Sequence, residues 1–133
     1  MDELSKLFNV IQDRRNNPTE NSYTSYLFDK GLDKILKKCG EECSEMIIAA
    51  KSYDFVRDGL KRLPNASDSI ERDKQSDLEN EVCDLLYHIT VLLAFFDIPL
   101  ENIDQILLER SKKINNLKTP RIIDMSSQNS EIE

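Results

Sequence analysis

The stretch LDKILKKCGEECSEMIIAA, residues 32–50, decides the fold class because its apolar side chains recur at helical spacing. Steps of four and three residues alternate along one set of apolar positions: Leu32, Leu36, Cys39, Cys43, Met46 and Ala50. At 100° per residue, these positions lie within about 40° of the first. They therefore form a narrow apolar seam, which predicts a long helix packed against other helices.

Acidic side chains run beside this seam instead of being spread over the solvent face. Glu41, Glu42 and Glu45 lie on one flank, with Glu42 at the border of the seam. Glu81 and Asp84 form a second acidic pair on the flank of a later apolar seam. Because residues three apart share a helix face, antiparallel packing of the two helices would bring one pair from each helix to the same level.

A divalent cation would explain why such carboxylates converge. Four close carboxylates without a cation repel one another and raise each other's pKa. Oxygen-only ligands favour Mg²⁺, with Mn²⁺ as a substitute, and helical bundles do build metal sites from inward-facing carboxylates. We predict four metal ligands: Glu42, Glu45, Glu81 and Asp84. The alternative is that these carboxylates are simply solvated, because Glu-x-x-Glu is common on helices.

The remaining sequence predicts an all-α fold, a bundle of about four to five helices. Apolar spacing indicates further helices in three regions, residues 4–16, 78–96 and 100–114. Capping residues indicate an ordered loop followed by a short helix in residues 22–31. Residues 52–76 are polar and rich in turn-forming residues, so we expect an exposed loop with one short helix before Pro64. The domain is expected to span residues 1–117, with residues 54–76 as an insertion and residues 118–133 as a polar, disordered tail.

Composition and charge limit the classes of partner. The chain has 133 residues, 39% of them hydrophobic, and a formal net charge of −7. These values indicate one soluble domain and argue against non-specific binding to nucleic acid or anionic membranes. No apolar run approaches the roughly 18 residues of a membrane span, and the N-terminus lacks a signal pattern, so we expect a cytoplasmic protein.

The cysteines do not predict a disulfide framework, because there are three of them and each lies in a helical pattern. Together with His88 they would suggest a zinc site. Cys39 and Cys43, however, lie on the apolar seam, where free cysteine packs as a small hydrophobe. His88 follows Asp84 by one helical turn and is either a core histidine or a contact to a ligand or substrate.

Two longer stretches resemble a known family: ENSYTSYLFDKGLDKILKKCGEECSEMIIAAK and ENEVCDLLYHITVLL. The family is phosphoribosyl-ATP diphosphatase, one of the all-α (MazG-like) nucleotide pyrophosphohydrolases, whose shared motif is Glu-x-x-Glu followed by Glu-x-x-Asp. Both halves are present, as Glu42 to Glu45 and Glu81 to Asp84, and the Ser22-Tyr23-Thr24 element narrows the resemblance to this branch. The resemblance covers roughly residues 4–112, with a longer link between the motifs than expected.

This resemblance implies Mg²⁺-dependent hydrolysis of 1-(5-phosphoribosyl)-ATP to 1-(5-phosphoribosyl)-AMP and pyrophosphate, the second step of histidine biosynthesis. It also implies a homodimer that completes the core. Glu41, Glu42 and Glu45 would be catalytic, with Glu41 orienting or deprotonating the water. The implied substrate contacts are hydroxyl residues, lysines and one histidine: Ser22, Tyr23, Thr24, Lys34, Lys37, Lys38, Lys51 and His88. Two alternatives stay open, a pyrophosphatase acting on dNTPs and a non-catalytic helical interaction module.

Overall fold

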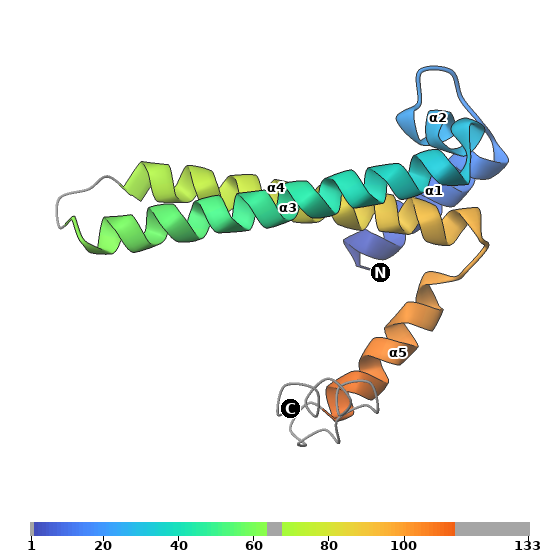
Figure 1. The fold of residues 1–133 in the computed structure, drawn as a ribbon. Helices are drawn as coiled ribbons and strands as arrows, with labels where there is room; N and C mark the ends of the chain where they lie inside the picture. Colours follow the sequence, from blue (N-terminus) through green and yellow to red (C-terminus); the bar gives the residue numbers. More distant parts are fainter. Residues whose placement is uncertain (1, 64–67, 114–133) are drawn as a thin grey trace, which may run out of the picture. The chain divides into compact units, whose positions relative to one another are not determined.

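The computed structural model describes residues 2–63 and 68–113, and within them every regular element is a helix. Five helices follow one another along the chain: α1 (Glu3–Asn16), α2 (Tyr23–Lys30), α3 (Leu32–Lys61), α4 (Asp68–Phe95) and α5 (Leu100–Lys112) (Figure 1). The predicted all-α class is confirmed. The chain divides into two compact units, residues 1–100 and 101–133, and α1 to α4 belong to the first. No single described helix is both long and apolar enough to cross a bilayer; α4 and α5 meet such a criterion only when taken as a pair across the break between them.

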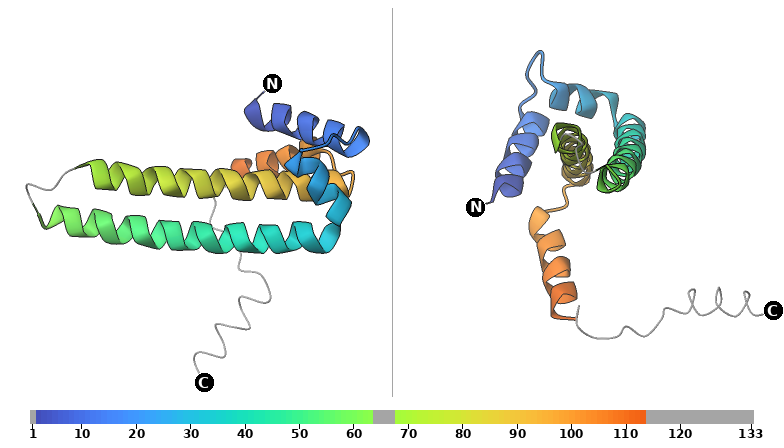
Figure 2. Two further views of the ribbon diagram at one scale, coloured as in Figure 1. Left: turned by 90° about the horizontal axis from the view of Figure 1, so that it is seen from above. Right: turned by 90° about the vertical axis from the view of Figure 1, so that its left-hand side faces the viewer.

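Two long helices, α3 and α4, form an antiparallel hairpin in the first unit (Figures 1 and 2). At 1.5 Å per residue, the 30 residues of α3 extend about 45 Å. The short helices α1 and α2 pack at the end of the hairpin that holds the start of α3 and the end of α4 (Figure 2). The buried apolar side chains of this unit gather there: Phe8, Ile11, Leu27, Ile35, Val91 and Ala94.

The turn between α2 and α3 depends on Gly31, as the capping pattern predicts. Gly31 has a φ of 90°, a conformation that side chains rarely adopt, and its N–H donates to the carbonyl of Leu27 at 3.0 Å. Its own carbonyl accepts from the N–H of Ile35 at 3.2 Å, so one residue ends α2 and begins α3. At the start of α2, the Ser22 side chain accepts from the N–H of Ser25 at 3.1 Å.

The interpretation of residues 52–76 as an exposed loop is wrong. α3 continues to Lys61 and α4 begins at Asp68, so most of this segment forms the two arms of the hairpin. Half-buried side chains recur along both arms at helical spacing: Tyr53, Val56 and Leu60 on α3, and Glu71, Lys74 and Leu78 on α4. Each polar arm is helical because it packs against the other, a tertiary effect that composition does not reveal. The expected short helix is part of α3, whereas Pro64 and the expected tail lie outside the described residues.

The predicted apolar seams are only partly covered within one chain. On α3, Ile35 and Glu42 are buried, whereas Leu36 is 46% exposed. The second half of α4 is the central helix that its all-round apolar pattern predicts, and Val91 is fully buried there. Ile89, on the predicted seam of the same helix, is nevertheless 38% exposed. Large apolar side chains of both long helices therefore remain at the surface of the single chain.

Candidate metal centre

Three carboxylates converge where α3 and α4 pack together. Glu42 and Glu45 come from α3 and Glu81 from α4, and one carboxylate oxygen from each lies within 4.8 Å of those of the other two. Their i, i+3 spacing places Glu42 and Glu45 on one face of α3. The antiparallel hairpin brings Glu81 opposite them, so residues from both acidic pairs meet at one level.

The surroundings of this group fit a cation. Glu42 is only 6% exposed, Glu81 is half-buried and Glu45 is exposed. The Oε2 atom of Glu81 is buried and has no hydrogen-bond partner within the described part of the chain. A buried polar atom without a partner costs about 1–3 kcal/mol, and more when it is charged. Because the group offers only oxygen ligands, its donor set suits a hard divalent ion such as Mg²⁺ or Mn²⁺.

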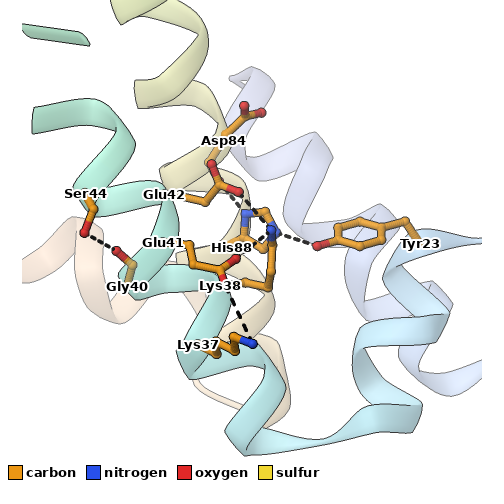
Figure 3. A network of polar contacts seen from close by, with 9 residues as sticks. All are labelled: Tyr23, Lys37, Lys38, Gly40, Glu41, Glu42, Ser44, Asp84 and His88. Atoms are coloured by element: carbon orange, nitrogen blue, oxygen red, sulfur yellow. Dashed lines mark hydrogen bonds and ion pairs between the residues drawn. The ribbon is translucent and has the colours of Figure 1, made fainter. Parts of the chain in front are cut away.

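Asp84, the fourth predicted ligand, is not brought into this group. Its side chain is exposed, and Figure 3 shows its carboxylate pointing away from that of Glu42. Asp84 follows Glu81 by three residues and shares its face of α4, yet only Glu81 reaches the acidic pair of α3. The backbone carbonyl of Asp84 instead accepts a hydrogen bond from Nδ1 of His88 at 2.7 Å.

Neither the cysteines nor the histidine joins the carboxylates. Cys39 and Cys43 are half-buried on α3, Cys83 is exposed on α4, and His88 is 5% exposed with both ring nitrogens in hydrogen bonds. Within residues 2–63 and 68–113, none of these four contributes to a metal-ligand group. The donor set is therefore all oxygen, which does not fit the zinc alternative.

Lys38 places a positive charge at the buried side of the carboxylate group. Its Nζ lies 3.1 Å from Oε2 of Glu41 and 3.4 Å from Oε1 of Glu42 (Figure 3). The hydrogen bond from Lys38 is the main reason why the pKa of Glu41 is lowered, and the same contact raises the pKa of Lys38. Lys37 lies farther away, with its Nζ 3.9 Å from Glu41. Glu41 therefore stays ionised at neutral pH, and Lys38 partly balances the charge of Glu42.

Tyr23, His88 and Asp84 form a chain of hydrogen bonds behind this ion pair (Figure 3). Because Nδ1 of His88 contacts the Asp84 carbonyl, which can only accept, Nδ1 carries the proton. In the neutral ring the other nitrogen, Nε2, is then an acceptor for the Tyr23 hydroxyl, which lies 3.0 Å away. Burial raises the pKa of Tyr23, which keeps its hydroxyl protonated as the donor. Both ring nitrogens of the buried His88 are thus held by partners in the fold.

Ser22 and Thr24, predicted as substrate contacts, both have partners in the fold. Ser22 caps α2, and the hydroxyl of Thr24 is hydrogen-bonded to that of Tyr87 on α4. The Tyr87 ring also stacks on Tyr23, with ring centroids 6.2 Å apart. The sequence alone did not assign a role to Tyr87, although its place directly before His88, in the second of the two stretches that resemble the family, was the available signal. These contacts attach α2 to α4 beside the carboxylate group.

The two remaining predicted lysines lie at different distances from the network. Lys34 is half-buried on α3, and its positive charge helps to lower the pKa of Glu41. Lys51 is exposed on α3, six residues after Glu45, and makes no ion pair within residues 2–63 and 68–113. The structure therefore brings Lys34, but not Lys51, to the side where Lys38 lies.

A cavity of about 320 Å³ adjoins the carboxylate group on the side opposite to Tyr23 and His88. Its walls come from α3 and α4: Glu45, Ile48, Ala49, Ser52, Lys74, Asp77, Asn80 and Glu81. Two of these, Glu45 and Glu81, also belong to the carboxylate group. Lys74 was missed at the sequence level because the arm that carries it was interpreted as a loop.

We expect Tyr23→Phe to lower the free energy of unfolding by about 1–2 kcal/mol, because it leaves Nε2 of the buried His88 without its donor. Urea denaturation followed by circular dichroism measures this change. Tyr26→Phe is the matched control, since Tyr26 lies one turn later on α2, is exposed to a similar extent, and makes no hydrogen bond through its hydroxyl to the described residues. Equal stability of the Tyr23 variant and the wild type would contradict the hydrogen-bond chain.

The all-α hairpin with carboxylates converging from two helices is the arrangement expected of the all-α nucleotide pyrophosphohydrolases that the sequence motifs resemble. A family model described as phosphoribosyl-ATP pyrophosphohydrolase matches residues 4–111, and the chain belongs to this family. The carboxylate group and the Tyr23–His88 contact both lie within the matched residues.

Several proteins named phosphoribosyl-ATP pyrophosphatase are similar to the chain over most of its length. The protein from Clostridium acetobutylicum is 49% identical over 118 residues, which cover 89% of each chain. One from Clostridium botulinum (strain Kyoto / Type A2) is 46% identical over 118 residues, again 89% of each chain. One from Bacillus cereus is 44% identical over 118 residues, 89% of this chain and 92% of the relative.

Proposed function

We propose that this protein is a phosphoribosyl-ATP pyrophosphatase, which hydrolyses 1-(5-phosphoribosyl)-ATP to 1-(5-phosphoribosyl)-AMP and pyrophosphate in the second step of histidine biosynthesis. Its family and its similarity to relatives with this name support the activity. The single structural observation that carries the proposal is the carboxylate group of Glu42, Glu45 and Glu81, with its buried, unpartnered Glu81 oxygen. Such a group suits an enzyme that binds a polyphosphate through a divalent cation.

Mg²⁺, or Mn²⁺ in its place, would be held by Glu42, Glu45 and Glu81. Asp84 stays a proposed ligand because it lies on the same face of α4 and its exposed side chain is free to change rotamer. When bound, the cation supplies positive charge that neutralises the oxygens of the polyphosphate. The protein's part is to fix the ligands, and Lys38 contributes by holding Glu42 through an ion pair at 3.4 Å.

The reaction replaces one phosphorus–oxygen bond with another. The oxygen of water bonds to the α-phosphorus, the bond from that phosphorus to the α–β bridging oxygen breaks, and pyrophosphate leaves with the bridging oxygen. One proton of the attacking water is released to solvent. Glu41 is a proposed catalytic residue that orients this water as a hydrogen-bond acceptor. Its lowered pKa keeps it ionised, which suits orientation, but also makes it a weak base.

Substrate contacts are proposed on the Lys38 side of the carboxylate group. Lys34, Lys37 and Lys38 would hold phosphate oxygens as point charges, and Lys51 is a more distant candidate on the same helix. Tyr23 is 45% exposed and its hydroxyl is hydrogen-bonded to His88, so its ring would contact the nucleoside or ribose. Ser22 and Thr24 would act through their backbone positions at the start of α2, since their side chains already have partners.

We propose that the active protein is a homodimer. Large apolar side chains stay exposed on both long helices: Leu36, Ile47, Ile48 and Phe55 on α3, and Ile70, Val82, Leu86 and Ile89 on α4. A second copy would cover such faces. Analytical ultracentrifugation should give about twice the chain mass of 15.4 kDa. A species of single-chain mass at micromolar concentration would contradict this assembly.

The activity is tested by measuring pyrophosphate release from phosphoribosyl-ATP, dCTP and dUTP, each with Mg²⁺ and with a chelator. We expect the highest kcat/KM for phosphoribosyl-ATP and loss of turnover in the chelator. Preference for a deoxynucleotide would instead identify a dNTP pyrophosphatase of the same class. No Mg²⁺-dependent release from any of the three would favour the non-catalytic interaction module.

A further inference from the structure

The cavity beside the carboxylate group contains one basic side chain, Lys74, and three acidic ones, Glu45, Asp77 and Glu81. Its volume of about 320 Å³ lies at the lower end of the range for small-ligand sites, about 300–1,000 Å³. Two of its carboxylates belong to the proposed metal centre. A ligand coordinated there would therefore extend directly into this cavity.

Lys74 is available for such a ligand. Its side chain is half-buried at the wall of the cavity and makes no ion pair within residues 2–63 and 68–113. Lys38 differs, because its ammonium group also forms ion pairs with Glu41 and Glu42. A lysine that is partly withdrawn from solvent without an acidic partner is suited to bind an anionic group that enters the cavity.

The charges of the side chains in the cavity wall determine under which condition an anion can enter the cavity. With three carboxylates and one lysine in its walls, the cavity alone repels phosphate. A divalent cation together with Lys74 carries three positive charges, which offset the three carboxylates of the cavity wall and remove this repulsion. An anion would therefore enter as a complex with the cation, with Lys74 as its second positive contact.

The position of the cavity indicates which part of the substrate it would take. The carboxylate group lies between two regions of the structure, one with Tyr23, His88 and Lys38, the other with Ser52 and Lys74. Aromatic rings in the first region suit the nucleoside. Among the described residues that line it, the second region has no aromatic side chain and offers an ammonium group, which suits the terminal phosphates.

We propose that Lys74 binds the pyrophosphate portion of the substrate, and the released pyrophosphate, in the cavity beside the carboxylate group. This inference rests on the proposed function and adds a substrate contact to it. It also gives a role to the arms of the hairpin, since residues 52 and 74 belong to the segment that sequence analysis interpreted as a loop.

Isothermal titration of inorganic pyrophosphate into the full chain, in the presence of Mg²⁺, tests the proposal. Lys74→Gln should raise the Kd for pyrophosphate about tenfold or more, the effect of losing one charge-assisted hydrogen bond. Arg72→Gln is the matched control, because Arg72 is exposed on the same helix and its replacement removes the same charge. Lys74→Arg should restore most of the affinity.

Two further measurements distinguish a direct contact between Lys74 and pyrophosphate from a structural role of Lys74 and from an effect on metal binding. Mn²⁺ affinity without pyrophosphate should not weaken in Lys74→Gln, since the lysine is not a metal ligand, and its circular dichroism spectrum should match the wild type. If wild-type protein releases no pyrophosphate from phosphoribosyl-ATP, the proposed function fails. If the wild type is active but Lys74→Gln binds pyrophosphate as tightly as Arg72→Gln, or the wild type binds none, the Lys74 inference alone is overturned.

Discussion

Replacing Glu42 with Gln is expected to lower kcat/KM for Mg²⁺-dependent pyrophosphate release by at least about 100-fold. Mutation of a residue that only supports a metal ligand typically lowers metal affinity or activity by about 10–100-fold. The loss of a ligand itself should therefore reach or exceed that range. Glu42 is the most buried of the three converging carboxylates, and Gln preserves its shape while removing its charge. Release of pyrophosphate from phosphoribosyl-ATP is the measurement.

Glu79→Gln is the control for this variant. Glu79 lies on α4 two residues before Glu81 and is exposed, and it accepts a hydrogen bond from Gln75 instead of joining the carboxylate group. Activity near that of the wild type is expected for Glu79→Gln. An unchanged helical circular dichroism spectrum in both variants would show that the fold is retained. Full activity of Glu42→Gln would remove Glu42 from the metal centre.

The second large effect is expected in stability, because a ligand that binds only the folded protein stabilises it. Mn²⁺ at 100 times its Kd should raise the free energy of unfolding by about 2.7 kcal/mol. The buried oxygen of Glu81 has no other partner within the described residues, so Glu81→Gln should abolish most of this increase. Urea denaturation with Mn²⁺ and with a chelator, at one protein concentration, measures both values.

The free energy of unfolding measured in the presence of a chelator is an independent check on Glu81. Without a cation, Glu81 brings a negative charge within 4.8 Å of two other carboxylates, so its replacement relieves repulsion. Glu81→Gln in chelator should therefore be at least as stable as the wild type. Equal stabilisation of both proteins by Mn²⁺ would show that the ion binds elsewhere and that these carboxylates are only solvated.

The part of the site that rests on local spacing could be predicted from the sequence. Glu42 and Glu45 flank an apolar seam, and helix geometry alone places them on one face, so only the antiparallel packing of a second acidic helix had to be assumed. The position of Gly31 between two helical patterns likewise located the turn that starts α3. Both features depend on neighbours within one or two helical turns.

Features that depend on side-chain rotamers or on long-range packing could not be predicted in this way. Asp84 shares a helix face with Glu81, but nothing in the spacing shows that its carboxylate points away from Glu42. The arms of the hairpin were misread because their composition is polar, and their helices depend on packing against each other. Lys74 was missed for the same reason, since a lysine in a loop has no defined neighbour.

The most direct test of the account is X-ray diffraction from crystals grown with Mn²⁺, using the anomalous signal of the ion to locate it. One peak is expected at coordination distance, about 2.0–2.6 Å, from carboxylate oxygens of Glu42, Glu45 and Glu81. Movement of Asp84 toward this peak would add it as the fourth ligand. A map with no anomalous peak between α3 and α4, at Mn²⁺ concentrations that support activity, would contradict the account.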